Sequence, residues 1–367
     1  MASGRQWVRK ARLAADPGFY VHVAACAEAA LEAQPGFLPA LELRSLALMN
    51  DHRFAEAREV SKAIVEQEPL DAIGLGTLSD ASLELGDFDA AAQAAQKLLD
   101  TRPGMAAYSR ASYLRWLQGD AKGAKALVLQ ALRAGRDARD PEPAAWTFVQ
   151  AAQIFWHEAD YDGAEAVYAE ALKWVPDYPQ ALVGRARVAL ARRQPERAVP
   201  WLESAWRRQP LPETAWLLGD ARTMLGDAAR ARAAYEQVVR SGRKSDRLTL
   251  ALFYATKDRD HDEALRLLEE ERRGRGGPYV DDAQAWALYR AGRIGEAQQA
   301  SERALRLGTR DARLLYHGGA IRLAAHDPSG RVLIERALAL NPGFDSTGAA
   351  EARELLAPGA QQARSAS

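Results

Sequence analysis

One pattern recurs in three segments of the chain: FAEAREVSKAIVEQEP (residues 54–69), FDAAAQAAQKLLDTRP (residues 88–103) and YDGAEAVYAEALKWVP (residues 161–176). Each segment begins with an aromatic residue, has an alanine three positions later and ends with a proline twelve positions after that. Prolines spaced by 34 residues extend the pattern in both directions: Pro35, Pro69 and Pro103, then Pro176 and Pro210. A period of about 34 residues with helical patterning indicates helix pairs that stack on one another.

The period divides the chain into ten units. We place their first residues at Gly4, Leu38, Ala72, Met105, Ala145, Pro179, Pro212, Ser245, Pro278 and Asp311. The twentieth position is small in eight units, and bulk is excluded there because one helix packs closely on the next: Ala57, Ala91, Ala124, Ala164, Ala198, Ala231, Ala264 and Ala297. Proline at the thirty-second position ends the second helix of a unit, since proline cannot continue it.

This recurrence resembles the tetratricopeptide repeat family over about residues 4–344. The C-terminal half is also similar to a widespread set of bacterial tetratricopeptide proteins that have no assigned chemistry. The resemblance implies an all-α fold, a right-handed α-solenoid of about ten helix pairs followed by a C-terminal capping helix. The family usually has glycine at position eight. Units seven and ten keep it as Gly219 and Gly318, whereas units two, three and four have Ser45, Ser79 and Ser112.

The expected organisation follows from the unit boundaries. Units one to four span residues 4–139, and units five to ten span residues 140–344. Between them the proline-rich insertion RDARDPEP (residues 136–143) is expected to form a solvated loop. Residues 345–357 are expected to form the polar capping helix that a solenoid needs at its end. We expect the last segment, residues 358–367, to be disordered.

The overall composition argues against several classes of function. The 367 residues include 49 Lys+Arg and 49 Asp+Glu, so the formal net charge is zero. A dedicated nucleic-acid or membrane-surface binder would need a basic excess, and neither partner is expected. No apolar stretch is long enough for a signal peptide core or a membrane span. The chain as given is therefore expected in the cytoplasm, and export is expected only if it is an N-terminally truncated form.

No catalytic or cofactor motif stands out. The six histidines are scattered, the single Cys26 leaves no zinc spacing, and no phosphate-binding glycine loop is present. The HGG run at residues 317–319 falls in the middle of an expected helix and has no accompanying nucleophile motif. We therefore expect no catalytic residue, no metal and no cofactor, and a protein that is not an enzyme.

The resemblance implies binding through the concave face, which positions 2, 5, 9, 12 and 13 of each unit line. At these positions units four to nine have nine aromatic residues: Tyr279 and the eight that we assign to partner binding, Tyr113, Trp116, Trp146, Trp156, Trp216, Phe253, Trp286 and Tyr289. The same units have three cations at these positions: Arg187, Lys257 and Arg290. Large rings dominate interface hot spots, so the set predicts a partner-binding groove over units four to nine. For any single ring the alternative, packing between units, stays equally open.

These residues lead to a functional hypothesis. The chain is expected to be a non-catalytic scaffold that binds a protein or peptide segment in its concave groove, with the three cations selecting an acidic or carboxylate-bearing segment. The alternative is that the chain is the partner-recruiting repeat portion of a larger enzyme or of a secretion or envelope assembly.

Charge is unevenly distributed along the chain. Residues 37–100 carry 12 acidic and 5 basic side chains, whereas residues 179–247 carry 14 basic and 7 acidic ones. Such opposite fields would favour head-to-tail self-association or steer a partner. The alternative is that an arginine-rich composition simply spreads arginine over solvated helix faces, and we favour it. The basic run RRGRGG (residues 272–277) replaces the expected proline of unit eight and is expected to be a flexible loop.

Overall fold

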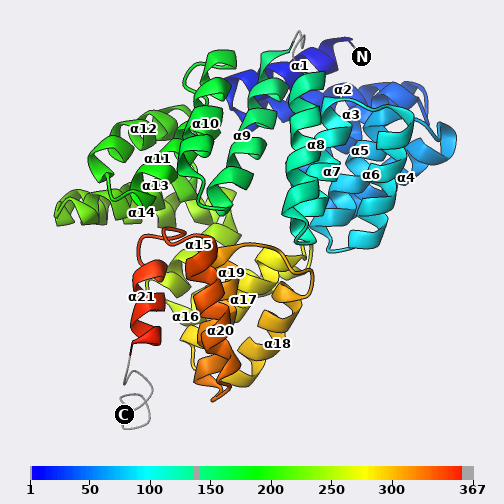
Figure 1. Cartoon of the computed structure of the whole chain (residues 1–367). Helices are drawn as coiled ribbons and strands as arrows, with labels where there is room; N and C mark the ends of the chain where they lie inside the picture. Colours follow the sequence, from blue (N-terminus) through cyan, green and yellow to red (C-terminus); the bar gives the residue numbers. More distant parts are fainter. Residues whose placement is uncertain (1, 136–139, 358–367) are drawn as a thin grey trace.

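The computed structural model describes residues 2–135 and 140–357, and within these ranges the chain is built from helices without any strand (Figure 1). Ten consecutive helix pairs and one final helix follow one another as a solenoid. The predicted all-α repeat fold is confirmed.

The first helix of each pair lies on the inner side of the solenoid. These inner helices are α1 (Ala2–Ala14), α3 (Leu38–Asn50), α5 (Ala72–Glu84), α7 (Met105–Leu117), α9 (Pro141–His157), α11 (Pro179–Ala191), α13 (Pro212–Met224), α15 (Arg247–Thr256), α17 (Pro278–Arg290) and α19 (Ala312–Ala324). The outer helices are α2 (Tyr20–Ala33), α4 (Phe54–Gln67), α6 (Phe88–Thr101), α8 (Ala121–Ala134), α10 (Tyr161–Trp174), α12 (Pro195–Arg208), α14 (Ala228–Ser245), α16 (His261–Arg272), α18 (Ile294–Leu305) and α20 (Ser329–Leu340). A short 3-10 turn (Pro17–Phe19) lies between α1 and α2, and α21 (Gly348–Leu356) ends the array.

The turn inside a unit is fixed by a glycine and an aspartate. Gly119 adopts a φ of +79°, the left-handed conformation that glycine reaches without strain. Asp120 is the N-cap residue of α8, and its carboxylate accepts a hydrogen bond from the Gly123 backbone N–H at 2.8 Å. This cap satisfies one of the amide groups that the first turn of a helix leaves without a partner.

Two serines at position eight form a specific contact between the helices of one unit. The Ser79 hydroxyl donates to the carbonyl oxygen of Ala91 at 2.9 Å, and the Ser112 hydroxyl donates to that of Ala124 at 2.7 Å. Each acceptor is the small residue at position twenty. A hydroxyl therefore replaces the usual glycine without loss of close packing, because it gains a buried hydrogen bond.

The insertion between units four and five is shorter than expected. Helix α9 begins at Pro141, so the predicted loop 136–143 is wrong over its last three residues, while residues 136–139 lie outside the described residues. Prolines are tolerated there because the first helical turn needs no donating N–H. The final helix α21 falls within the expected range 345–357, and the predicted tail 358–367 lies outside the described residues.

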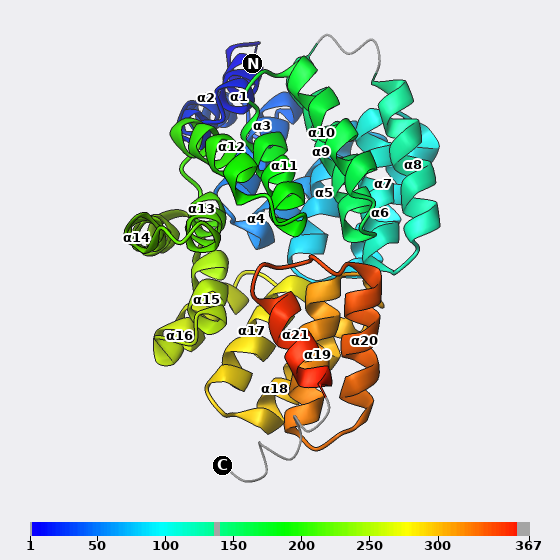
Figure 2. The same cartoon turned by 60° about the vertical axis from the view of Figure 1, so that its left-hand side comes forward.

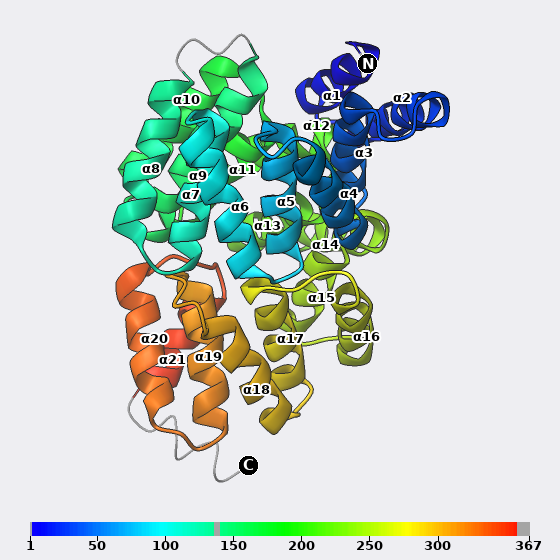
Figure 3. The same ribbon diagram turned by 90° about the vertical axis from the view of Figure 1, so that its right-hand side faces the viewer.

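The solenoid coils tightly enough for its C-terminal units to contact its N-terminal ones, and Figure 3 shows α17–α20 directly beneath α5–α8. The Gly276 backbone N–H donates to the carbonyl oxygen of Glu84 at 2.7 Å, and the Thr309 hydroxyl donates to that of Leu117 at 2.6 Å. The Asn341 amide donates to the carbonyl oxygen of Trp156 at 2.8 Å. The three contacts therefore join units three, four and five to the turns that lie six repeats later.

The three acceptors share one property, because each belongs to the last turn of an inner helix, where carbonyl groups have no partner within the helix. The first contact also involves the basic run 272–277. Arg275 forms an ion pair with the side chain of Glu84 at 2.6 Å, so the expected flexible loop is instead held against the turn that follows α5. The coil is closed by capping of helix ends.

Asn341 offers a test of this closure. It is fully buried, and its side chain also accepts hydrogen bonds from the Tyr161 hydroxyl at 2.6 Å and from the Gly343 backbone N–H. We expect Asn341→Ala to lower the free energy of unfolding by about 1 to 3 kcal/mol, because buried polar groups lose their partners. Urea denaturation followed by circular dichroism measures the change.

The only other asparagine of the chain is a matched control. Within the described residues, the Asn50 side chain bonds only its neighbour Asp51, at the surface, so Asn50→Ala should change stability by less than about 0.5 kcal/mol. Equal effects of the two substitutions would contradict the importance of the closure contacts.

Candidate functional site

A cavity of about 330 Å³ lies on the inner side of α7, α9, α11 and α13. Six aromatic rings line it: Tyr113, Trp116, Trp156, Trp216, Tyr279 and Phe344. Tyr279 and Phe344 come from the C-terminal units, and the segment 343–346 before α21 forms one wall. The closure of the coil therefore converts an open inner face into a cavity with a wall from the far end of the chain.

The rings on the first wall stack on one another. Trp116 is 4% exposed and lies 6.0 Å from the Tyr113 ring and 6.4 Å from the Tyr279 ring, measured between centroids. The His157 ring lies 4.6 Å from the same tryptophan. This cluster joins α7, α9 and α17, so these rings are rigid parts of the cavity wall. Burial raises the pKa of the Tyr113 hydroxyl far above its ordinary value, and the hydroxyl stays neutral.

Trp156 and Trp216 are half-buried and expose part of their rings to the cavity. The guanidinium of Arg187 lies 5.8 Å from the Trp156 ring and is ion-paired with Glu213. The Trp156 indole nitrogen has no hydrogen-bond partner within residues 2–135 and 140–357. The ring is thus held mainly by packing and by the arginine beside it.

Charged groups at the base of the cavity form a second layer. His157 lies 3.8 Å from the carboxylate of Asp311, which is 6% exposed. Burial lowers the pKa of His157, and this effect exceeds the attraction of Asp311. Burial opposes ionisation of Asp311 as well, but His157 and Arg313 hold the pKa of that carboxyl below its usual value.

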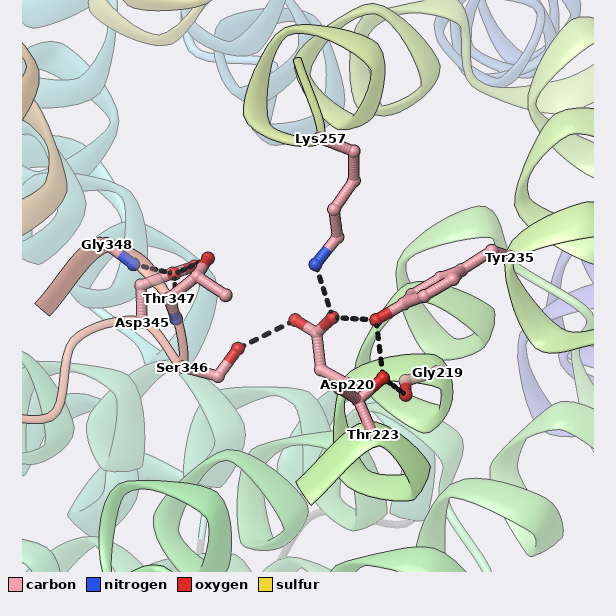
Figure 4. A network of polar contacts seen from close by, with 9 residues as sticks. All are labelled: Gly219, Asp220, Thr223, Tyr235, Lys257, Asp345, Ser346, Thr347 and Gly348. Atoms are coloured by element: carbon pink, nitrogen blue, oxygen red, sulfur yellow. Dashed lines mark hydrogen bonds and ion pairs between the residues drawn. The ribbon is translucent and has the colours of Figure 1, made fainter. Parts of the chain in front are cut away.

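Asp220 on α13 connects three parts of the chain, as Figure 4 shows. Its carboxylate accepts hydrogen bonds from Lys257 Nζ at 2.7 Å, from the Tyr235 hydroxyl at 2.6 Å and from the Ser346 hydroxyl at 2.8 Å. Burial, followed by the charge of Asp220, raises the pKa of Tyr235 to about 12. Asp220 raises the pKa of Lys257 although burial acts in the opposite direction, so Lys257 is charged.

Five of the eleven residues predicted to bind a partner line this cavity: Tyr113, Trp116, Trp156, Arg187 and Trp216. Lys257 is joined to it only through Asp220. Phe253 is 1% exposed and packs edge-on against Trp216 at 5.4 Å, within the core. It therefore supports a cavity-lining ring and offers no surface of its own.

The other predicted residues lie elsewhere. Trp286 is 1% exposed and stacks on the ring of His317 at 3.9 Å, so it belongs to the core. Tyr289 is half-buried and stacks on Trp286, and Arg290 is paired with Glu351 of α21 at 2.8 Å. Trp146 is 41% exposed and does not line the cavity.

The cavity residues that the sequence analysis did not assign to binding include His157, Asp311, Arg313 and Phe344. His157 stands at position thirteen of unit five, which Lys257 and Arg290 occupy in their own units. The rule that concave-face positions line the groove therefore also selects His157. The other three reach the cavity only because the coil closes, and no local pattern marks them.

Sequence models of the tetratricopeptide repeat family match residues 42–106 and 155–218. The chain contains tetratricopeptide repeats. Such repeats generally act as non-catalytic protein-interaction scaffolds. No curated protein matches the sequence significantly.

Solved structures similar to this tetratricopeptide repeat protein include human IFIT1 with m7Gppp-AAAA, at a TM-score of 0.53 and 13% identity over 92% of this chain and 80% of that chain. A tetratricopeptide repeat protein from Parabacteroides merdae has a TM-score of 0.46 and 16% identity over 68% of this chain and 100% of that chain. The likeness to IFIT1 shows the fold alone.

The described part of the chain offers neither a membrane-spanning helix nor a metal site. Within residues 2–135 and 140–357, no helix is both long enough and apolar enough to span a membrane. In the same ranges, no group of three or more His, Cys, Asp or Glu side chains has the arrangement that would hold a metal ion.

The buried His157 predicts a pH dependence of stability. The ordinary pKa of histidine is 6.5 and the folded value is lower, so below about pH 6.5 the unfolded chain binds more protons than the folded one. Stability should therefore fall as the pH drops through this range. We expect His157→Gln to flatten this dependence in urea denaturation between pH 8 and pH 5, whatever it does to stability at pH 8.

The exposed His22 is the control, and His22→Gln should retain the wild-type dependence. If the stability of His157→Gln fell as steeply with decreasing pH as that of the wild type, a group other than His157 would be responsible for the proton uptake.

Proposed function

We propose that this chain is a non-catalytic scaffold that binds a segment of a partner protein in the cavity of units four to seven. The observation that carries the proposal is the ring-lined cavity of about 330 Å³, in which Trp156 and Trp216 are half-buried and face open space. Large rings of this kind give much contact area at a low entropic cost and form the hot spots of protein interfaces.

The shape of the cavity limits how a segment enters. Tyr279, Arg313 and the segment 343–346 lie across its C-terminal side, so the inner face is not an open trough at this point. A chain end or a protruding loop fits such a site better than a long segment that runs through it. We infer that the partner inserts one or two apolar or aromatic side chains between the tryptophans.

The predicted selection of an acidic partner has no support at this cavity. Each of the three cations is already paired with a carboxylate of the same chain: Arg187 with Glu213, Lys257 with Asp220 and Arg290 with Glu351. The lining residues include two arginines and four carboxylates. The affinity that we propose therefore comes from ring contacts and not from capture of negative charge.

The same charges argue against a nucleic-acid ligand. The similar IFIT1 structure is described with m7Gppp-AAAA, but that protein is only 13% identical to this chain. Phosphate binding requires a local excess of basic groups, and in this cavity the carboxylates outnumber the guanidinium groups.

The first experiment identifies the partner. A photoreactive amino acid at Gln153, which lines the cavity, should crosslink the partner segment in cells, and mass spectrometry then gives its sequence. With that segment as ligand, Trp156→Ala should weaken binding by about 1 to 4 kcal/mol, because truncation of a hot-spot ring costs this much. Isothermal titration calorimetry measures the loss.

Trp146 provides a matched control, because it is the same residue type on the same helix but lies outside the cavity. Trp146→Ala should leave the affinity unchanged. If Trp146→Ala weakened binding and Trp156→Ala did not, the exposed face of α9 would be the binding surface and the cavity proposal would fail.

A further inference from the structure

Helix α14 leaves part of one face uncovered. It has 18 residues, whereas the other outer helices have 12 to 14, and the helix that follows it, α15, has only 10. The last turns of α14 pack tightly on α15, since a Cβ at Gly242 would lie 2.7 Å from Leu250 Cβ. Figure 2 shows α14 at the outer edge of the solenoid, above α15 and α16.

A groove of about 840 Å³ lies along the uncovered face. Seven of its lining residues lie on α14: Ala228, Ala231, Arg232, Tyr235, Glu236, Val239 and Arg240. Thr223, Gly226, Ala228 and Ala231 line the end near the turn after α13, and Arg259 of the turn between α15 and α16 completes the lining. We call this surface the α14 groove. It shares no lining residue with the inner cavity.

The charges of the α14 groove differ from those of the cavity. In the described part of the chain, no carboxylate lies within 4.0 Å of the guanidinium of Arg232 or Arg240, although other arginines nearby are paired. Arg259 is 3.4 Å from Asp260 and lies over the rings of two neighbours in α15. Glu236 is the only carboxylate among the lining residues, so the groove has a net positive charge.

We propose that the α14 groove binds an acidic amphipathic helix of a partner protein. The apolar part of its floor, Ala228, Ala231, Tyr235 and Val239, offers contact to a strip of small apolar residues. Arg232 and Arg240 are eight residues apart, about 12 Å along the helix. Carboxylates seven or eight residues apart on the partner helix would reach both guanidinium groups, which are free to form charge-assisted hydrogen bonds.

A protein helix fits this groove better than a nucleic acid. Glu236 lies between the two unpaired arginines and would repel a phosphate backbone, and the floor between them is apolar. A helical partner satisfies both features, because it brings carboxylates only where the arginines are and apolar atoms elsewhere. The groove shares no lining residue with the inner cavity, so this inference does not rest on the proposed function.

A synthetic peptide tests the inference with the full-length protein. The probe is a fluorescein-labelled, alanine-rich helix with glutamate at two positions seven residues apart on one face and leucine between them, and a scrambled peptide of the same composition is the reference. Fluorescence anisotropy at about 0.15 M salt, where exposed charges are screened, should show binding of the patterned peptide only. No binding up to millimolar protein would overturn the proposal.

Two variants locate the binding surface. Arg232→Glu/Arg240→Glu should weaken binding at least about tenfold, because two attractive contacts become repulsive. Ala228→Trp should have a similar effect by filling the exposed end of the groove without a change of charge. Arg232, Arg240 and Ala228 are all exposed, so these variants are expected to fold. Circular dichroism checks the folding.

A matched charge control separates specific from diffuse attraction. Arg230 and Lys244 are exposed on the same helix and do not line the groove, so Arg230→Glu/Lys244→Glu makes the same change of net charge. We expect less than a threefold loss for this control. Equal losses for the two double variants, or equal competition by a single-stranded oligonucleotide, would overturn the assignment of a protein helix to the groove.

Discussion

The structure depends on the capping of helix ends across the coil. The last carbonyl groups of an inner helix have no partner in their own helix, and in water they would bond solvent. Here Glu84 and Leu117 bond instead to the turns that precede α17 and α19. The carbonyl oxygen of Trp156 accepts a hydrogen bond from the Ala159 backbone N–H and a further one from the turn that precedes α21. The two side-chain contacts join residues that are 192 and 185 positions apart in the sequence. This separation is nearly constant, so the same unit geometry repeats and closes the coil.

This closure determines the character of the inner face. Once the C-terminal units lie beneath units three to five, Tyr279 and Phe344 meet tryptophans that are more than 100 residues away in sequence. Charged groups are desolvated in the same step, and each finds a partner within the chain, as Asp220 does with Lys257 (Figure 4). Burial of a charge is costly unless it is paired, so the inner cations are neutralised internally.

Charged side chains on the outer surface are not subject to this constraint. Solvated arginines need no partner, so Arg232 and Arg240 keep their guanidinium groups free. The inner cavity therefore offers rings and the α14 groove offers charge, although the sequence analysis assigned both properties to one inner face. A scaffold with two such surfaces can hold two segments at once, and linking two segments in one partner would raise the effective affinity.

The sequence by itself determined the repeat and the all-α solenoid, because proline, glycine, aspartate and small residues act within one unit. It also found Trp116, Trp156, Trp216 and Arg187, since the face of a helix follows from its periodicity. Only the tertiary structure decided that Trp286 and Phe253 are core residues, that Arg290 is paired with Glu351, and that Asn341 caps α9. The Asn341 contact joins units that are far apart in the chain, whereas the core positions of Trp286 and Phe253 depend on how neighbouring units pack. The angle by which each unit turns on the next, summed over six units, is not encoded in any single repeat.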